Sequence, residues 1–177
     1  MKTVTELLDL AKEKMVRGNW SEIFIAVDLH GTILKRSKWR TIQNGSVSET
    51  SLNSDVSSSD LQSSFFPMAE MTLREISKTP GLRLILFTSS TDAKIEKYLK
   101  MFQQIGIIFC EVNCNSEVIS DVQYADFSKK FYFDVLFDDK AGFDSKKDWT
   151  EIFRWVQENS EFLKTRSAKG KNEKQYS

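Results

Sequence analysis

The chain has 177 residues, of which 40% are hydrophobic and 28% are charged, and its 25 basic and 25 acidic side chains leave no net charge. This length is typical of one domain with its own hydrophobic core, and the balanced charge excludes a general electrostatic affinity for nucleic acid or anionic membranes. No apolar run approaches the ~20 residues of a membrane span, and the partly acidic, amphipathic N-terminus excludes a signal peptide.

The first predicted elements are an amphipathic helix and a buried strand. Residues 3–17 place apolar side chains on one helical stripe, with Thr3 or Thr5 as the N-cap and Gly18 as the end of the helix. Residues 23–28, Ile-Phe-Ile-Ala-Val-Asp, have the length and the β-branched content of a strand covered on both faces. The polar residues that follow predict an abrupt loop at the carboxyl end of this strand.

Residues 35–66 have a different composition. They begin with a short basic patch and continue with Gln43-Asn44-Gly45-Ser46, which is typical of a two-residue hairpin turn. Nine serines among the nineteen residues 46–64 predict a mobile loop, because few of these side chains can be buried. Such a segment forms either a lid over the strand end or a tolerated surface insertion. The basic patch consists of Lys35, Arg36, Lys38 and Arg40.

The rest of the chain alternates between helices and strands. This alternation predicts one α/β domain over residues 1–164, built as a three-layer α/β/α sandwich with a Rossmann-like central parallel sheet. The insertion at residues 35–66 is a short hairpin and loop within that domain. We expect helices at residues 68–78, 92–104 and 146–164, strands at residues 82–87, 107–112 and 131–137, and a disordered polar tail at residues 165–177.

The two cysteines, Cys110 and Cys114, are expected to stay reduced. Four residues of extended strand separate them by roughly 13 Å, which is too far for a disulfide bond. A metal site is disfavoured because the single histidine lies elsewhere in the chain. Reduced thiols near the core indicate a cytoplasmic protein.

Three of the predicted strands end in polar side chains, and the carboxyl ends of parallel strands lie at one edge of a sheet, where ligands bind. Each residue alone also fits a structural role, such as a turn or a helix cap. Three carboxylates at one place repel each other unless a cation lies between them, and oxygen ligands favour Mg²⁺ over zinc. The polar residues are Asp28 with His30, Thr88 with Ser89, and Asp138 with Asp139.

A lysine, either Lys129 or Lys130, and the hydroxyl of Thr88 can add donors to this edge. Together with a metal ion they would form a cradle for a tetrahedral dianion, with one carboxylate free to attack it. Carboxylate attack on phosphorus, giving an aspartyl-phosphate, is established enzyme chemistry. The sequence therefore predicts Mg²⁺-dependent chemistry on a phosphoryl group.

The same residues resemble the motifs of the haloacid dehalogenase superfamily of phosphohydrolases, over about residues 22–146. Each motif alone has low specificity, whereas the ordered set of four is specific. The family has Asp-x-Asp-Gly-Thr after a hydrophobic strand, a strand that ends in Thr or Ser, a lysine, and an acidic pair followed by another acid. The matching residues are Asp28-Leu29-His30-Gly31-Thr32, Leu84-Ile85-Leu86-Phe87-Thr88, Lys129 or Lys130, and Asp138-Asp139 with Asp144.

The resemblance implies a role for each matching residue, and a short insertion instead of a large cap. Asp28 would be the nucleophile and a Mg²⁺ ligand, and Thr88, with Ser89, would hold phosphoryl oxygens. Lys129 or Lys130 would offset the negative charge of the nucleophile and the phosphate. The metal ligands implied are Asp28, Asp139, the backbone carbonyl of His30, and Asp138, which either shares the ligation or supports it.

His30 stands where the family's phosphatases carry a second aspartate as acid and base. Histidine can perform both tasks, with an unperturbed pKa of ~6.5. Three outcomes remain open: His30 acts as the acid and base, the enzyme is slow and prefers good leaving groups, or the protein has lost turnover and only binds a phosphorylated ligand.

The expected function is therefore phosphomonoester hydrolysis of a small phosphorylated metabolite or nucleotide. The alternative is a catalytically weak or inactive binding or regulatory protein with the same fold. Dehalogenation is disfavoured, because that branch of the family does not need the acidic metal cluster. A homodimer is a possible assembly, in which a second subunit would complete the lid.

Overall fold

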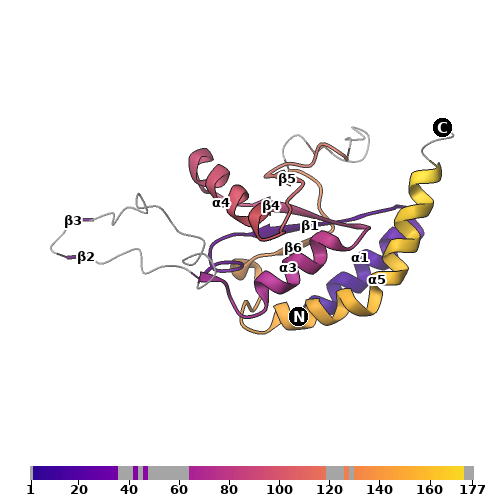
Figure 1. The fold of residues 1–177 in the computed structure, drawn as a ribbon, viewed down its shortest axis with the longest axis horizontal. Helices are drawn as coiled ribbons and strands as arrows, with labels where there is room; N and C mark the ends of the chain where they lie inside the picture. Colours follow the sequence, from indigo (N-terminus) through magenta and orange to yellow (C-terminus); the bar gives the residue numbers. More distant parts are fainter. Residues whose placement is uncertain are drawn as a thin grey trace.

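The computed structural model describes residues 2–35, 42–43, 46–47, 64–118, 126–127 and 130–173. Its centre is a four-stranded sheet, and a second sheet is a two-stranded hairpin (Figure 1). The strands are β1 (Ile23–Asp28), β2 (Ile42–Gln43), β3 (Ser46–Val47), β4 (Leu82–Phe87), β5 (Glu111–Val112) and β6 (Val135–Phe137). The helices are α1 (Val4–Arg17), α3 (Ala69–Lys78), α4 (Asp92–Gln104) and α5 (Asp148–Glu173), with a 3-10 helix, η1, at Asp139–Ala141.

The central sheet is parallel throughout, in the order β5-β4-β1-β6. Strand β1 pairs with β4 along its whole length, so that Asp28 lies opposite Phe87. On its other side β1 pairs with β6, whose last residue, Phe137, lies opposite Val27. The carboxyl ends of all three strands therefore lie at one edge of the sheet. The predicted α/β class and the Rossmann-like parallel sheet are confirmed.

One hydrophobic core joins the sheet to the helices. Ile23, Ile25 and Val27 of β1 are fully buried and belong to a core that takes side chains from α1, α3, α4 and α5. Helix α5 packs against α1 and α3, and these three helices lie together beside the sheet (Figure 1). Helix α1 buries the predicted apolar stripe except for Leu7, which is exposed. Thr3 caps the helix as predicted and accepts a hydrogen bond from the Glu6 amide.

Two strands are shorter than predicted. Residues 107–110 precede β5, because the amide of Ile107 donates to the Phe102 carbonyl and thus closes the end of α4 (2.9 Å). Residues 131–134 precede β6; the Asp134 amide still donates to the Phe24 carbonyl of β1 (2.8 Å), and the three aromatic side chains before it pack on neighbouring rings. The Tyr132 ring, for example, packs edge-on against Phe24 of β1 with ring centroids 6.2 Å apart.

The last helix is longer than predicted. Helix α5 continues to Glu173, so the disordered tail expected from residue 165 is wrong for residues 165–173. The extra turns are anchored, since Arg166 donates hydrogen bonds to the Trp20 carbonyl (3.1 Å) and to Asn19 (2.6 Å), and Ser167 is buried. Among the helices of the described ranges, none is both long and apolar enough to cross a membrane.

The insertion leaves and re-enters the domain at adjacent points. The Lys35 amide donates to the Ser64 carbonyl (2.8 Å). The predicted hairpin is confirmed, because β2 and β3 pair antiparallel through Ile42–Val47 and Gln43–Ser46. Most of the basic patch and of the serine-rich stretch lies outside the described residues, so the lid stays a prediction.

The turn between α3 and β4 needs a glycine for two reasons. Gly81 has φ +89°, and a Cβ atom there would lie 3.0 Å from the carbonyl oxygen of Leu163 in α5. Gly106 has a similar φ of +80°, but its added Cβ would meet only the Arg74 side chain, at 3.9 Å. A side chain at either position would therefore strain the backbone, but only at Gly81 would it also press against the backbone of α5.

We expect Gly81→Ala to lower the free energy of unfolding by about 2–4 kcal/mol, and Gly106→Ala by about 1–2 kcal/mol, because only the first substitution also pushes α5 away. Urea denaturation of both variants measures the difference. Equal losses would show that the contact with Leu163 contributes nothing.

Candidate functional site

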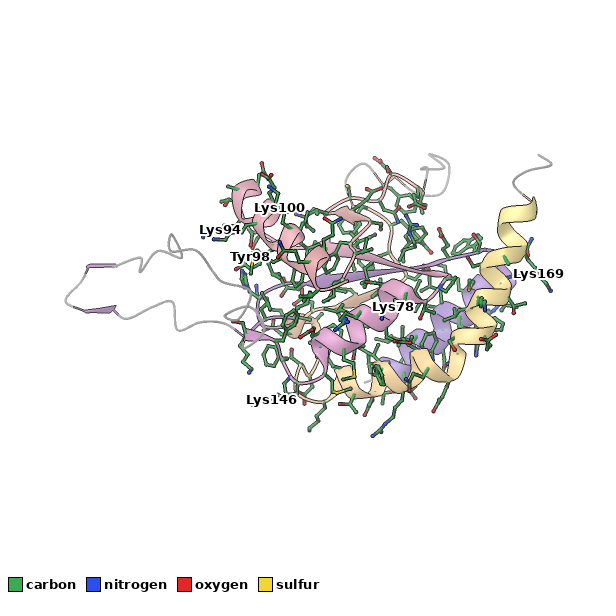
Figure 2. The ribbon with its side chains drawn as sticks, in the orientation of Figure 1. Lys78, Lys94, Tyr98, Lys100, Lys146 and Lys169 are labelled. Carbon is green, nitrogen blue, oxygen red and sulfur yellow. The ribbon has the colours of Figure 1, made fainter. Side chains whose placement is uncertain are left out.

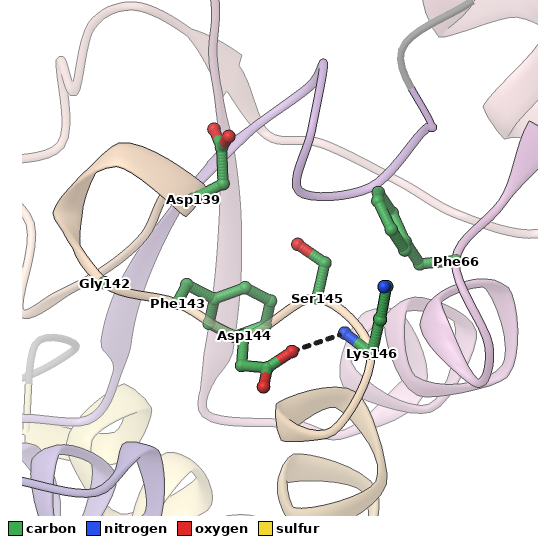
Figure 3. Close-up of a pocket in the computed structure, with 7 residues that line it drawn as sticks. All are labelled: Phe66, Asp139, Gly142, Phe143, Asp144, Ser145 and Lys146. Atoms are coloured by element: carbon green, nitrogen blue, oxygen red, sulfur yellow. Dashed lines mark hydrogen bonds between the residues drawn. The ribbon is translucent and has the colours of Figure 1, made fainter.

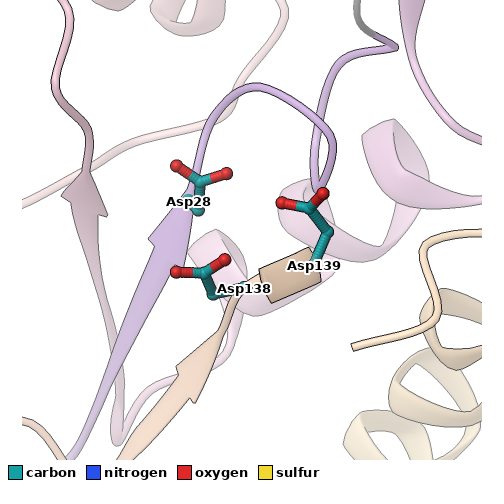
Figure 4. Close-up of side chains that lie close together, drawn as sticks. All are labelled: Asp28, Asp138 and Asp139. Atoms are coloured by element: carbon teal, nitrogen blue, oxygen red, sulfur yellow. The ribbon is translucent and has the colours of Figure 1, made fainter. Parts of the chain in front are cut away.

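Three carboxylates meet at the carboxyl edge of the sheet. Asp28 is the last residue of β1, and Asp138 and Asp139 directly follow β6. Their nearest oxygen atoms all lie within 4.8 Å of one another, and all three residues are partly buried (Figure 4). This acidic triad can hold a metal ion, because one cation can contact an oxygen of each residue.

The charge on the triad is costly in the metal-free protein. Burial raises the pKa of Asp28 from its ordinary value to about 6, and the negative charges of Asp138 and Asp139 add to the rise. The Leu29 amide and the Lys140 ammonium oppose this effect without cancelling it. The arrangement fits a bound cation, which would supply the missing positive charge.

Thr32 joins two members of the triad and was not singled out for this from the sequence. Its side chain is fully buried. The hydroxyl accepts a hydrogen bond from the Asp139 amide (2.9 Å) and donates one to Asp28 Oδ2 (3.4 Å). One buried hydroxyl thus fixes the distance between the end of β1 and the loop after β6. Its position four residues after Asp28 was visible in the sequence, but its contact with Asp139, 107 residues away, was not.

Residues just before and at the start of α5 hold the loop that follows β1. Gly31 has φ +102°, and its amide donates to the Leu34 carbonyl (2.8 Å), which closes a tight turn. Ser145 Oγ donates to the Gly31 carbonyl (2.5 Å), and Trp149 Nε1 donates to the Thr32 carbonyl (3.0 Å). The loop carbonyls are therefore satisfied by residues that follow the acidic pair in sequence.

The acidic pair belongs to the turn of η1. Asp138 Oδ1 accepts a hydrogen bond from the Lys140 amide (2.8 Å), which caps η1. Asp144, the further acid of the sequence motif, is not part of the triad. Its carboxylate accepts from the Lys146 amide (3.0 Å) and lies 3.5 Å from Lys147 Nζ, so that it organises the approach to α5.

The predicted phosphate-binding hydroxyl lies at the end of β4, the strand that pairs with β1. Thr88 follows Phe87, the register neighbour of Asp28, and is largely buried, whereas Ser89 is exposed. The Thr88 hydroxyl accepts a hydrogen bond from the Ser90 amide (3.2 Å) and contacts the Ser90 hydroxyl (3.2 Å). The structure therefore brings Thr88 to the edge that carries the triad.

His30 is partly buried and packs against α4. Its ring lies edge-on to Tyr98, with centroids 5.6 Å apart, and Tyr98 in turn stacks on the buried Phe102. Figure 2 labels Tyr98 on α4.

Of the two candidate lysines, the structure describes only Lys130. Lys129 lies outside the described residues. Lys130 is exposed, and its Nζ lies 5.6 Å from the centroid of the Phe133 ring. The neighbouring Phe131 packs on Phe87, opposite Asp28, which places this segment near the end of β4. Among the described residues, Lys140 supplies a positive charge that lowers the pKa of Asp28, and sequence reasoning missed it.

A shallow cleft of about 520 Å³ adjoins the triad at Asp139 (Figure 3). In the view of Figure 3, Phe66, at the return of the insertion, and Lys146 lie on one side of the cleft and Asp139 lies on the other. The remaining lining residues are Gly142, Phe143, Asp144 and Ser145.

Comparisons with known proteins give a likeness in structure alone. No protein-family model and no curated protein matches the chain. A conserved protein from Bacteroides thetaiotaomicron has a similar solved structure, with 22% sequence identity and a TM-score of 0.48, over 81% of this chain and 97% of that one. The likeness concerns the course of the chain and gives no information on chemistry.

We expect Asp28→Asn to stabilise the metal-free protein above pH 6. The raised pKa means that, between about pH 4 and 6, the folded state still holds a proton that the unfolded state has lost, so wild-type stability falls as pH rises through this window. Removing the charge should raise the free energy of unfolding by about 1–2 kcal/mol at pH 7.5 and change it little at pH 4. Denaturation in EDTA at both pH values measures this. A gain that is equal at both would contradict the electrostatic cause.

We expect Thr32→Val to weaken Mg²⁺ binding about tenfold or more, because the variant keeps the shape of the side chain but loses both links between the aspartates. Isothermal titration calorimetry provides the dissociation constant. Thr79→Val is the matched control, since that hydroxyl donates only to the Glu75 carbonyl within α3. Equal metal affinity in the Thr32 variant and wild type would show that the hydroxyl does not position the triad.

Proposed function

We propose that the protein is a Mg²⁺-dependent phosphomonoester hydrolase of the haloacid dehalogenase type, which works through an aspartyl-phosphate on Asp28. The observation that carries this proposal is the acidic triad, with oxygen atoms within 4.8 Å of one another at the carboxyl edge of a parallel sheet. The order of Asp28, Thr88 and the acidic pair along the chain supports it, as does the position of Thr88 next to the nucleophile's strand.

The donor set indicates magnesium. All three side-chain ligands are carboxylates, which hard cations prefer, and the free cysteines lie elsewhere, on either side of β5. Asp28, Asp139 and the carbonyl of His30 would hold the ion, with Asp138 sharing or supporting the ligation. When bound, the ion would neutralise the triad and offset the charge on the transferring phosphoryl group.

The first half of the reaction uses Asp28 and His30. A carboxylate oxygen of Asp28 attacks phosphorus, and the bond from phosphorus to the ester oxygen breaks. Protonated His30 gives its proton to the departing oxygen, so the product leaves as an alcohol. Thr88 donates a hydrogen bond to a phosphoryl oxygen, and Lys130 or Lys129 supplies positive charge.

The second half returns the enzyme to its starting state. Neutral His30 removes a proton from a water molecule, whose oxygen attacks phosphorus. The bond between phosphorus and Asp28 breaks, which releases inorganic phosphate and regenerates the carboxylate. His30 is then protonated again, ready for the next ester. The substrate that suits a short insertion is a small phosphorylated metabolite or a nucleotide.

Hydrolysis of p-nitrophenyl phosphate and of a broad panel of phosphate esters, with and without Mg²⁺, tests the function. We expect metal-dependent phosphate release, its loss by at least about a thousandfold in Asp28→Asn, and retained or higher activity in His30→Asp. Asp92→Asn, which removes an exposed carboxylate of α4, is the control. Inactive wild type combined with an active His30→Asp variant would favour the alternative, a protein that only binds phosphorylated ligands.

A further inference from the structure

An asparagine outside all the predicted motifs holds the backbone of Thr88. Asn113 directly follows β5, and its side-chain Oδ1 accepts a hydrogen bond from the Thr88 amide (2.8 Å). Its Nδ2 donates to the Thr88 carbonyl (2.7 Å). Both backbone polar groups of Thr88 are therefore bound by one side chain. Thr88 lies one residue beyond the end of β4, and this carboxamide supplies the hydrogen-bond partners that a neighbouring strand would otherwise provide.

The backbone of Asn113 is itself in an uncommon conformation. Its φ is +53°, in the left-handed region, and its amide donates to the Leu86 carbonyl (2.9 Å). Asparagine tolerates this region better than most residues other than glycine. The left-handed turn ends β5 and points the carboxamide across to β4, where it binds Thr88. The two hydrogen bonds and the turn form one device.

The device fixes Thr88 relative to the nucleophile. Because Asp28 lies opposite Phe87, Thr88 is one residue beyond it on the neighbouring strand. Because the amide and carbonyl of Thr88 are bound to Asn113, the hydroxyl is the polar group that Thr88 can offer to a ligand. That hydroxyl donates a hydrogen bond to the Ser90 hydroxyl. A shift of this backbone would move the hydroxyl away from the phosphoryl group.

We propose that Asn113 is the positioning residue for the phosphate-binding hydroxyl of Thr88, a role that rests on the proposed phosphatase function. Asn113 itself touches neither substrate nor metal in this scheme. It acts by holding the Thr88 peptide in register with Asp28. A merely structural residue at this place would affect stability, whereas a positioning residue affects phosphate binding and leaves metal binding intact.

Asn113→Gly tests this role. Glycine accepts the left-handed backbone and adds no charge, so the turn is kept while both hydrogen bonds to Thr88 are lost. Ser77→Ala is the matched control, because it also removes two hydrogen bonds, one of them from the Ile108 amide in the segment that leads into β5. Ser77 lies at the carboxyl end of α3, away from the triad.

The readouts are the inhibition constant of inorganic phosphate, the kinetic constants for p-nitrophenyl phosphate, and the Mg²⁺ dissociation constant. We expect Asn113→Gly to weaken phosphate inhibition and to lower kcat/KM by about ten- to a hundredfold, as is typical of a misplaced binding group, with Mg²⁺ affinity within about twofold of wild type. Ser77→Ala should change none of the three. Unchanged phosphate inhibition in Asn113→Gly overturns the proposal.

A measurement on the wild-type protein covers the case in which the glycine variant does not fold. In nuclear magnetic resonance spectra recorded with Mg²⁺, added inorganic phosphate should shift the Asn113 side-chain amide signals together with the Thr88 amide signal. Phosphate binding that leaves the Asn113 signals in place overturns the role of Asn113 alone. A wild-type protein that neither hydrolyses esters nor binds phosphate refutes the proposed function, and this role with it.

Discussion

The repulsion between Asp28, Asp138 and Asp139 is the constraint on which the site depends. Burial and two neighbouring negative charges raise the pKa of Asp28 to about 6, so without a cation these carboxylates repel one another at neutral pH. The surrounding structure keeps these groups together despite that repulsion. Thr32 bridges the two strand ends, and the start of α5 binds the loop that carries Thr32. The arrangement therefore lowers the stability of the metal-free protein, and a bound cation would relieve the repulsion while all three carboxylates stay charged.

Two sets of residues lie at the carboxyl edge of the sheet: those proposed to react and those that hold them in place. The proposed reacting groups lie on the short segments just beyond β1, β4 and β6, where side chains are free of the sheet ladder. They are supported by hydrogen bonds that the motifs themselves do not reveal: the Asp139 amide to Thr32, Trp149 to the Thr32 carbonyl, and Asn113 to Thr88. These bonds set the distances between strand ends, and rigid support of this kind is what a catalytic constellation requires.

The elements that could be predicted are those with a strong local pattern. The strands at 23–28 and 82–87 and the helix at 92–104 have the predicted bounds, since long apolar runs and helical periodicity are properties of neighbouring residues. The apolar content of residues 131–134 wrongly predicted that the strand begins at residue 131. Aromatic residues that pack beside a sheet and aromatic residues within a strand look alike in sequence. Polar content misled after residue 164, where Arg166 anchors α5 to the end of α1.

By itself, the sequence determined the order of the strands and helices, the parallel sheet, and the acidic residues that meet at its edge. These follow from patterns within about ten residues and from the rule that parallel strands end together. Only the tertiary structure decided how close these acids lie and which residues support them: Asp144 stays outside the triad, the charge of Lys140 opposes the rise in the Asp28 pKa, and Asn113 binds Thr88. The physical reason is that such contacts join residues far apart in the chain, and no local pattern encodes them.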